Sequence, residues 1–376
     1  MRTHALLVSA LAVWIAGCSP RPDGRSGSWD PGAAAVYLDQ RQDWWVRWPG
    51  SARDHATFCI SCHTVLPYAL GRAQLDGPLD GRPASPQESR LRADVVKRVR
   101  LWNQTLPYYT DQRNGRPKSV QSRGTEAVLN ALILVSEDAR TGRLSPDTKS
   151  ALEHMWETQE LTGDSSGAWA WLDFDLQPWE TRDAQYFGAA MAALAVGTAP
   201  ENYRSTATIQ GPLQRLTAYL DRNYDAQPLH QRLALLWAAS SLPQLIAPAR
   251  RQAIIDAAFR AQHADGGWSL YALAPSYRRF ARILRLWSDG YATGFVTFVL
   301  ERAGVPRGDP RLQRGLSWLV HHQQPEGFWP AYSINQRMSW TTPKGRFMSD
   351  AATAYAVLAL TQGSVEPVPA LRQARR

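Results

Sequence analysis

The sequence predicts an all-α fold, built from helical hairpins that repeat about every 50 residues. Apolar residues recur at helical spacing in these repeats, as in Ile254, Ile255 and Ala258. Three of the repeats share a glutamine that is followed by Gly-x-Trp. The second helix of each of these three is rich in Gly and Ala, as around Gly188, which permits close contact between helices.

The N-terminus reads as an export signal. Ala5 to Ile15 is an apolar run of the right length for the core of a signal peptide, and it ends in Ala-Gly-Cys18. This ending resembles a bacterial lipobox, so residues 1–17 are expected to be removed and Cys18 to carry lipid. The alternative is ordinary secretion with Cys18 left free. Ser19 favours the outer membrane over the inner one by resemblance to bacterial sorting, and 18–30, rich in Pro, Gly and Ser, is expected to be a flexible tether on the periplasmic side.

Residues 31–88 are expected to hold a Trp-rich helix, from Ala33 to Trp48, and then a cofactor-attachment segment. Cys59 and Cys62 are three positions apart, and His63 follows at once. This spacing is typical of covalent c-type haem, with one thioether to each sulfur and the imidazole as proximal iron ligand. Two alternatives remain open: a disulfide between the two thiols, or a zinc site, for which a second pair of ligands is missing.

The second axial ligand would decide what a haem does. Met338 and Met348 are the distal candidates, because both lie in the last long loop region. A methionine there would favour electron transfer or redox sensing, whereas an open position would favour oxidation of an apolar ligand held in the fold. Without haem, the chain would be a binding or scaffold lipoprotein with Cys59 and Cys62 joined.

Five hairpins are expected in 89–362, followed by a basic tail at 363–376. Three carry Gly-x-Trp, and their second helices are expected at Asp183 to Val196, Asp289 to Ala303 and Asp350 to Thr361. The other two hairpins lack that motif and pair Arg90 to Asn103 with Thr125 to Glu137, and Leu213 to Tyr224 with Leu229 to Ser241.

The Gly-x-Trp repeats carry a resemblance. The three copies contain Trp156, Gln159, Gly167 and Trp169; Phe259, Gln262, Gly266 and Trp268; and Trp318, Gln323, Gly327 and Trp329. This pattern resembles the QW motif of squalene-hopene cyclases and the related prenyltransferases. The resemblance implies an α/α toroid with an inner and an outer layer of helices, closed by the N-terminal Trp-rich helix. It also implies that the Gln and Trp side chains are structural, and that the loops after Gly-x-Trp emerge at one end.

The chemistry of those families is not expected here. Cyclases need paired carboxylates in Asp-x-Asp-Asp at the start of an inner helix, where this chain has single residues, Asp183, Asp289 and Asp350. A single Asp there is more simply a helix cap. Prenyltransferases hold zinc through a cysteine of the toroid, and no cysteine follows Cys62. Whether the chain is an enzyme stays open.

Composition limits the partners. The 376 residues carry a formal charge of +9, and the basic residues are spread out except for a cluster from Arg278 to Arg285 and the C-terminal tail. No nucleic-acid motif accompanies this charge, so a solvated surface is expected. The expected partners are a membrane through the lipid anchor, a periplasmic redox partner and an apolar small molecule.

Overall fold

The computed structural model describes residues 28–77, 79, 84–105, 115–275 and 279–362, and it confirms an all-α fold. Its helices are α1 Pro31–Arg47, α2 Val65–Gly71, α3 Pro86–Arg100, α4 Gly115–Thr141, α5 Pro146–Glu157, α6 Gln185–Thr198, α7 Gln210–Arg222, α8 Leu229–Ser241, α9 Pro248–Arg260, α10 Leu270–Leu273, α11 Gly290–Arg302, α12 Pro310–His322 and α13 Phe347–Thr361. Two short antiparallel strands, β1 Ala52–Arg53 and β2 Thr57–Phe58, are the only named strands of the described part.

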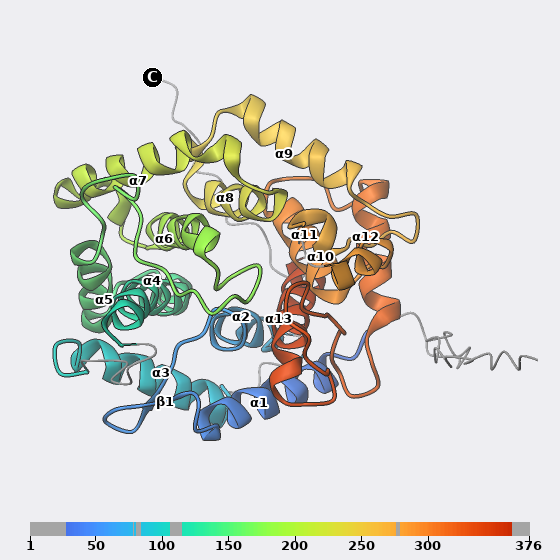
Figure 1. Cartoon of the computed structure of the whole chain (residues 1–376), viewed down its shortest axis with the longest axis horizontal. Coiled ribbons are helices and arrows are strands. Elements are labelled where there is room, and N and C mark those ends of the chain that lie inside the picture. Colours follow the sequence, from blue (N-terminus) through green and yellow to red (C-terminus); the bar gives the residue numbers. More distant parts are fainter. Residues whose placement is uncertain (1–27, 78, 80–83, 106–114, 276–278, 363–376) are drawn as a thin grey trace, which may run out of the picture.

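The helices form two concentric layers (Figure 1). The inner layer contains α2, α4, α6, α8, α11 and α13, and the outer layer contains α1, α3, α5, α7, α9 and α12. An inner helix such as α6 is apolar on all sides because it is covered on all sides: every residue from Tyr186 to Val196 is buried. The outer helices bury one face only, as α7 does through Leu213, Leu216, Tyr219 and Leu220.

The ring contains six hairpins rather than five. The sixth is formed by α1 and α2, so the segment expected to attach a cofactor outside the toroid supplies one of its inner helices. The sequence hides α2 because the helix has only seven residues and contains Pro67. Gly71 allows α2 to touch α13: a Cβ at Gly71 would lie 2.9 Å from the carbonyl oxygen of Ala354.

The Gly-x-Trp units have the structural role that the resemblance implied. Each glutamine amide donates to the glycine carbonyl of its own unit and to a backbone carbonyl at the start of the next outer helix, with Asp30 as that acceptor for Gln323. Each Trp indole is fully buried and donates to a carbonyl of the preceding outer helix, as Trp268 does to Ala258 at 2.7 Å. The three units therefore link α5 to α7, α9 to α12 and α12 to α1. Their Trp indoles also satisfy carbonyls in the last turns of the outer helices, which lack partners within the helix.

The three loops after Gly-x-Trp meet at the end of the ring where the inner helices begin. Asn335 accepts a hydrogen bond from the amide of Gln177 and donates to the carbonyl of Asp175. The amide of Gly290 donates to the carbonyl of Pro330, which ties the second loop region to the third. We call this end of the ring the N-terminal mouth.

Most of the predictions for the two ends of the chain concern residues that the structure does not describe. The predicted signal peptide, the lipidation site Cys18 and the basic tail 363–376 lie outside the described residues. The last two residues of the predicted tether belong to the fold, because Asp30 caps α1 and Trp29 packs against Trp329. None of the described helices is long and apolar enough to cross a bilayer.

Candidate functional site

The Cys59–His63 segment joins the small β1–β2 hairpin to the start of α2. The amide of Cys59 donates to Ser51 O at 2.7 Å, and the indole of Trp45 donates to Cys59 O at 2.8 Å. The hydroxyl oxygen of Ser61 accepts from the amides of Thr64 and Val65, at 3.3 and 3.1 Å. It therefore satisfies two free donors at the N-terminus of the helix and fixes the turn that carries the motif.

Both thiols of the motif lie inside the protein. Cys62 is 1% exposed and Cys59 is 9% exposed, and neither takes part in a disulfide. Burial raises the pKa of Cys59, and it raises the pKa of Cys62 well above its ordinary value. The thiols are therefore protonated at neutral pH, which is the unreactive form.

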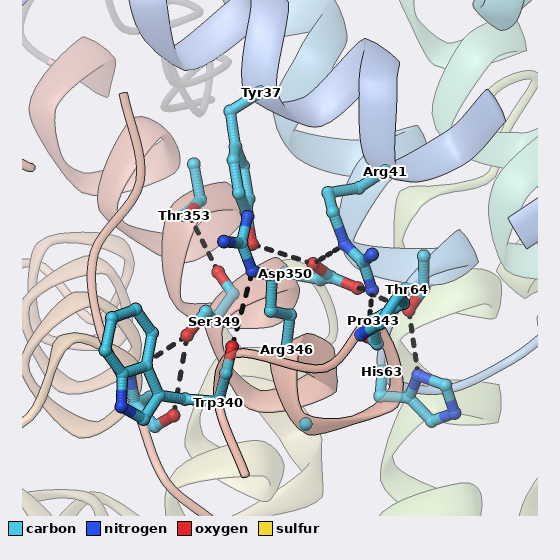
Figure 2. A network of polar contacts seen from close by, with 12 residues as sticks. Tyr37, Arg41, His63, Thr64, Trp340, Pro343, Arg346, Ser349, Asp350 and Thr353 are labelled. Carbon is cyan, nitrogen blue, oxygen red and sulfur yellow. Dashed lines mark hydrogen bonds and ion pairs between the residues drawn. The ribbon is translucent and has the colours of Figure 1, made fainter. Parts of the chain in front are cut away.

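His63 has a defined tautomer. Its Nδ1 lies 2.9 Å from the hydroxyl oxygen of Thr64, and that hydroxyl donates its one proton to Asp350 (Figure 2). The hydroxyl oxygen must then accept from Nδ1–H, so Nε2 carries the free lone pair. Burial lowers the pKa of His63 to about 3, with Arg41 adding to the effect, so the imidazole is neutral.

Asp350, in the first turn of α13, is the centre of the network in Figure 2. Its carboxylate accepts from Arg41 Nε at 2.6 Å, from Arg41 Nη2 at 2.9 Å and from the hydroxyl of Tyr37 at 3.0 Å. Arg41 and Asp350 are 6% and 2% exposed, so this is a buried, bidentate ion pair. It connects α1 to α13 and indirectly fixes the orientation of His63.

A second carboxyl group faces the other nitrogen of His63. Glu180 Oε1 lies 4.0 Å from His63 Nε2, and the amide and thiol of Cys62 hydrogen-bond to the same carboxyl group. Burial raises the pKa of Glu180 to about 7, against the effect of the Cys62 hydrogen bonds. At neutral pH the thiol and the imidazole are uncharged, and burial favours the protonated form of the carboxyl far more than water would.

Aromatic rings enclose the rest of the imidazole. Phe347 stacks on His63 with ring centroids 4.0 Å apart, and Trp45 meets the ring edge-on at 5.1 Å. Trp179 is 6.3 Å away. Almost no surface of His63 is left for a further group.

A haem bonded to this motif would have to displace part of this packing. A porphyrin bonded to Cys59 and Cys62 would need the Cys62 thiol, which is hydrogen-bonded to Glu180, and would need the space next to Nε2 that Glu180 faces. The group opposite Nε2 is Glu180, and not Met338 or Met348: Met348 is buried in the first turn of α13 and Met338 is half-buried in the last loop. No three His, Cys, Asp or Glu side chains among residues 28–77, 79, 84–105, 115–275 and 279–362 are arranged to hold a metal ion.

The single acids at the other inner-helix starts behave as caps or surface groups. Asp289 accepts from the amide of Ala292 at 2.9 Å, as predicted for an N-cap, and also from the amide of Leu270. Burial raises the pKa of Asp289 to about 6. Asp183 is exposed.

A cavity of about 610 Å³ opens at the opposite end of the ring, where the inner helices end. Each inner helix contributes at least one apolar side chain to its floor, including Leu70, Ile133, Leu194, Trp237, Phe298 and Leu358. Charged side chains form its rim: Glu88, Arg92, Glu137, Arg140, Glu301 and Arg302.

Most of the rim charges are paired. Arg92 binds Glu137 at 2.6 Å, and Glu301 binds Arg307 at the same distance, while burial raises the pKa of Glu301 to about 7. Arg302 is exposed and has no ion-pair partner in the described part of the chain, although partial burial of its guanidinium lowers its pKa. The rim therefore presents one uncompensated cation beside an apolar floor.

Sequence reasoning found part of these sites. It singled out Cys59, Cys62 and His63, which the structure places together, but it missed Glu180 and gave Asp350 only a capping role. It also missed the cavity. The signal for the cavity is the pair of charges, Glu301 and Arg302, that directly follows the fully buried and largely apolar stretch of α11.

Comparison with known proteins gives one short similarity. No family model matches the chain. Over 108 residues the chain is 30% identical to a probable squalene–hopene cyclase of Sinorhizobium fredii (strain NBRC 101917 / NGR234). The match covers 28% of this chain and only 15% of that protein. It supports a cyclase-like helical fold, in agreement with the two-layered ring.

Proposed function

We propose that the chain is an exported, lipid-anchored binding protein that holds an amphiphilic small molecule in the cavity at the C-terminal ends of its inner helices. The observation that carries this proposal is the floor of the cavity, to which all six inner helices contribute an apolar side chain. The volume of about 610 Å³ suits a drug-sized or lipid-sized ligand. Largely apolar hollows with a few polar groups at the rim are the usual form of small-molecule sites.

The rim indicates the sign of the ligand's head group. Arg92 and Arg140 already have acidic partners, Glu137 and Asp76, whereas Arg302 has none among the described residues. A guanidinium stays charged even where burial lowers its pKa. An anionic head beside Arg302 would supply the missing counter-ion, while the apolar body of the ligand covers the floor.

Isothermal titration calorimetry with decanoate tests the proposal. The protein is the mature chain without lipid, residues 18–376 with Cys18→Ser. Leu194→Trp, which fills the floor, should weaken binding at least tenfold. Leu161→Trp is the matched control, because Leu161 is 62% exposed and does not line the cavity. The proposal is wrong if neither decanoate nor decanol binds, or if both variants bind like the parent chain.

Covalent haem, with electron transfer or redox sensing, is the second candidate. Besides the motif, the tautomer of His63 favours it, because a ligating imidazole usually donates its other N–H to a fixed partner and here Nδ1–H donates to Thr64. Glu180, Phe347 and Trp45 would have to move to admit the porphyrin.

Intact mass decides between free thiols, a Cys59–Cys62 disulfide and haem. The chain is exported in a bacterial host that attaches c-type haem, and the mature protein is weighed with and without thiol alkylation. The binding proposal expects a colourless protein whose mass shows two free or mutually bonded sulfurs. An added porphyrin mass with a Soret band would establish the haem candidate instead.

A further inference from the structure

One surface segment remains outside the proposed function. It is the short 3-10 helix η7, Arg279–Leu286, in the second mouth loop, together with the following Trp287. Ile283, Leu286 and Trp287 are 61%, 68% and 62% exposed. A 3-10 helix has three residues per turn, so Ile283 and Leu286 lie on the same face of η7.

The segment is held firmly against the protein. The side chain of Leu284, between the exposed residues, is half-buried and packs against the core. The carbonyl of Leu284 accepts from the hydroxyl of Ser269 at 2.9 Å and from the amide of Trp287 at 3.3 Å. The three apolar side chains are thus presented to solvent on either side of a residue that contacts the core.

Exposed apolar side chains are concentrated in this region. Nine large hydrophobic side chains of the described chain are exposed, and six of them come from the three loops of the N-terminal mouth: Phe174, Ile283, Leu286, Trp287, Tyr332 and Trp340. Scattered single residues of this kind are ordinary on a protein surface, whereas their concentration in one region indicates an interaction site.

The charge of the segment identifies the partner. From Arg278 to Trp287 the sequence contains four arginines and no acidic residue. Arg285, between the apolar residues, is exposed. A short amphipathic segment with Trp, Leu and Ile on one side and arginines beside them is the composition that binds at the headgroup level of an anionic bilayer.

We propose that η7 and Trp287 dock the toroid onto an anionic membrane surface. Ile283, Leu286 and Trp287 enter the boundary between headgroups and acyl chains, and Arg285 pairs with lipid phosphates. The contact is independent of the cavity and of lipid on Cys18. A lipid anchor at Cys18 would strengthen it, because two weak membrane contacts on one chain act together.

Vesicle co-sedimentation tests this docking surface with residues 18–376 carrying Cys18→Ser, so that no lipid is attached. The chain should bind phosphatidylcholine vesicles with 30% phosphatidylglycerol, a composition chosen to be about as anionic as a bacterial membrane surface. It should bind vesicles of phosphatidylcholine alone at least tenfold more weakly.

The triple variant Ile283→Ser, Leu286→Ser, Trp287→Ser should lose at least tenfold in affinity for the anionic vesicles. The control changes two exposed apolar residues outside the mouth loops, Val36→Ser with Leu161→Ser, and should bind like the parent chain. Far-UV circular dichroism confirms that both variants are folded. The inference is overturned if the parent chain does not bind anionic vesicles, or if the triple variant binds them as well as the parent does. The patch would then belong to a protein partner.

Discussion

Asp350→Asn is the substitution that the structure predicts to be most informative about stability. The carboxylate of Asp350 is 2% exposed and accepts four hydrogen bonds: two from Arg41, one from Tyr37 and one from Thr64, at 2.6 to 3.0 Å. The amide of Asn is nearly the same size but is neutral, and one of its two polar atoms is a donor. It therefore leaves the buried guanidinium of Arg41 without a counter-ion.

Removing one partner of a buried ion pair costs about 3–5 kcal/mol, because an uncompensated charge stays in the interior. With a slope of about 3 kcal/mol per M urea, this loss lowers the unfolding midpoint by about 1–1.7 M. Urea titration followed by circular dichroism measures that shift. Asp43→Asn is the matched control, since Asp43 pairs with Arg47 at the surface, where such a pair contributes at most about 1 kcal/mol.

A double-mutant cycle with Arg41→Met separates the ion pair from the rest of the network. If the charge left on Arg41 causes the loss, the double variant should be more stable than Asp350→Asn alone, because no charge is stranded. The reasoning is refuted if Asp350→Asn shifts the midpoint no more than Asp43→Asn does, or if the two core substitutions are simply additive.

Three further outcomes are expected. Gly167→Ala should lower the free energy of unfolding by at least about 2 kcal/mol more than Gly163→Ala, as measured by thermal or urea titration. Both glycines have positive φ, but of the two only Gly167 would place a Cβ within 2.1 Å of a backbone oxygen. Equal losses of stability in the two variants would contradict this. Burial raises the pKa of Glu180 to about 7, so its contribution to stability is complete below its unfolded pKa of about 4.3 and is lost as the pH rises through 7. Glu180→Gln should therefore flatten the decline of the urea midpoint between pH 5 and pH 8, whereas the exposed control Glu326→Gln should not. Finally, Arg302→Gln should weaken decanoate binding at least tenfold and leave the binding of the uncharged decanol unchanged. If the variant weakens the binding of both ligands equally, Arg302 does not recognise the charge of the head group.

The sequence predicted those parts of the fold that depend on local pattern. The second helices of the Gly-x-Trp hairpins were expected from 183, 289 and 350, and they begin at Gln185, Gly290 and Phe347. The resemblance also implied the structural role of the Gln and Trp residues, whose bonds to backbone groups of their own unit are local to the motif. Periodicity and a repeated motif are enough for elements of this kind.

Long-range partners escaped the sequence reasoning. Asp350 and Arg41 are separated by 309 residues, and nothing local to either indicates that they pair. Glu180 belongs to a loop for which the sequence predicts only a place at the N-terminal mouth, yet the ring brings its carboxyl to His63. The motif at Cys59 to His63 predicts a cofactor because the spacing is chemically specific, but spacing alone carries no information about Phe347, which stacks on the imidazole.

The contact between the first and last hairpins constrains how the molecule can be made. A chain is synthesised from its N-terminus, so α1 and α2 are complete long before α13 is available. Until then Arg41 lacks its counter-ion, and Asp30 lacks the side chain of Gln323 that binds its backbone. The N-terminal hairpin therefore waits, incompletely folded, for the last helix, and a chain truncated before residue 347 would be left as an open arc exposed to proteolysis.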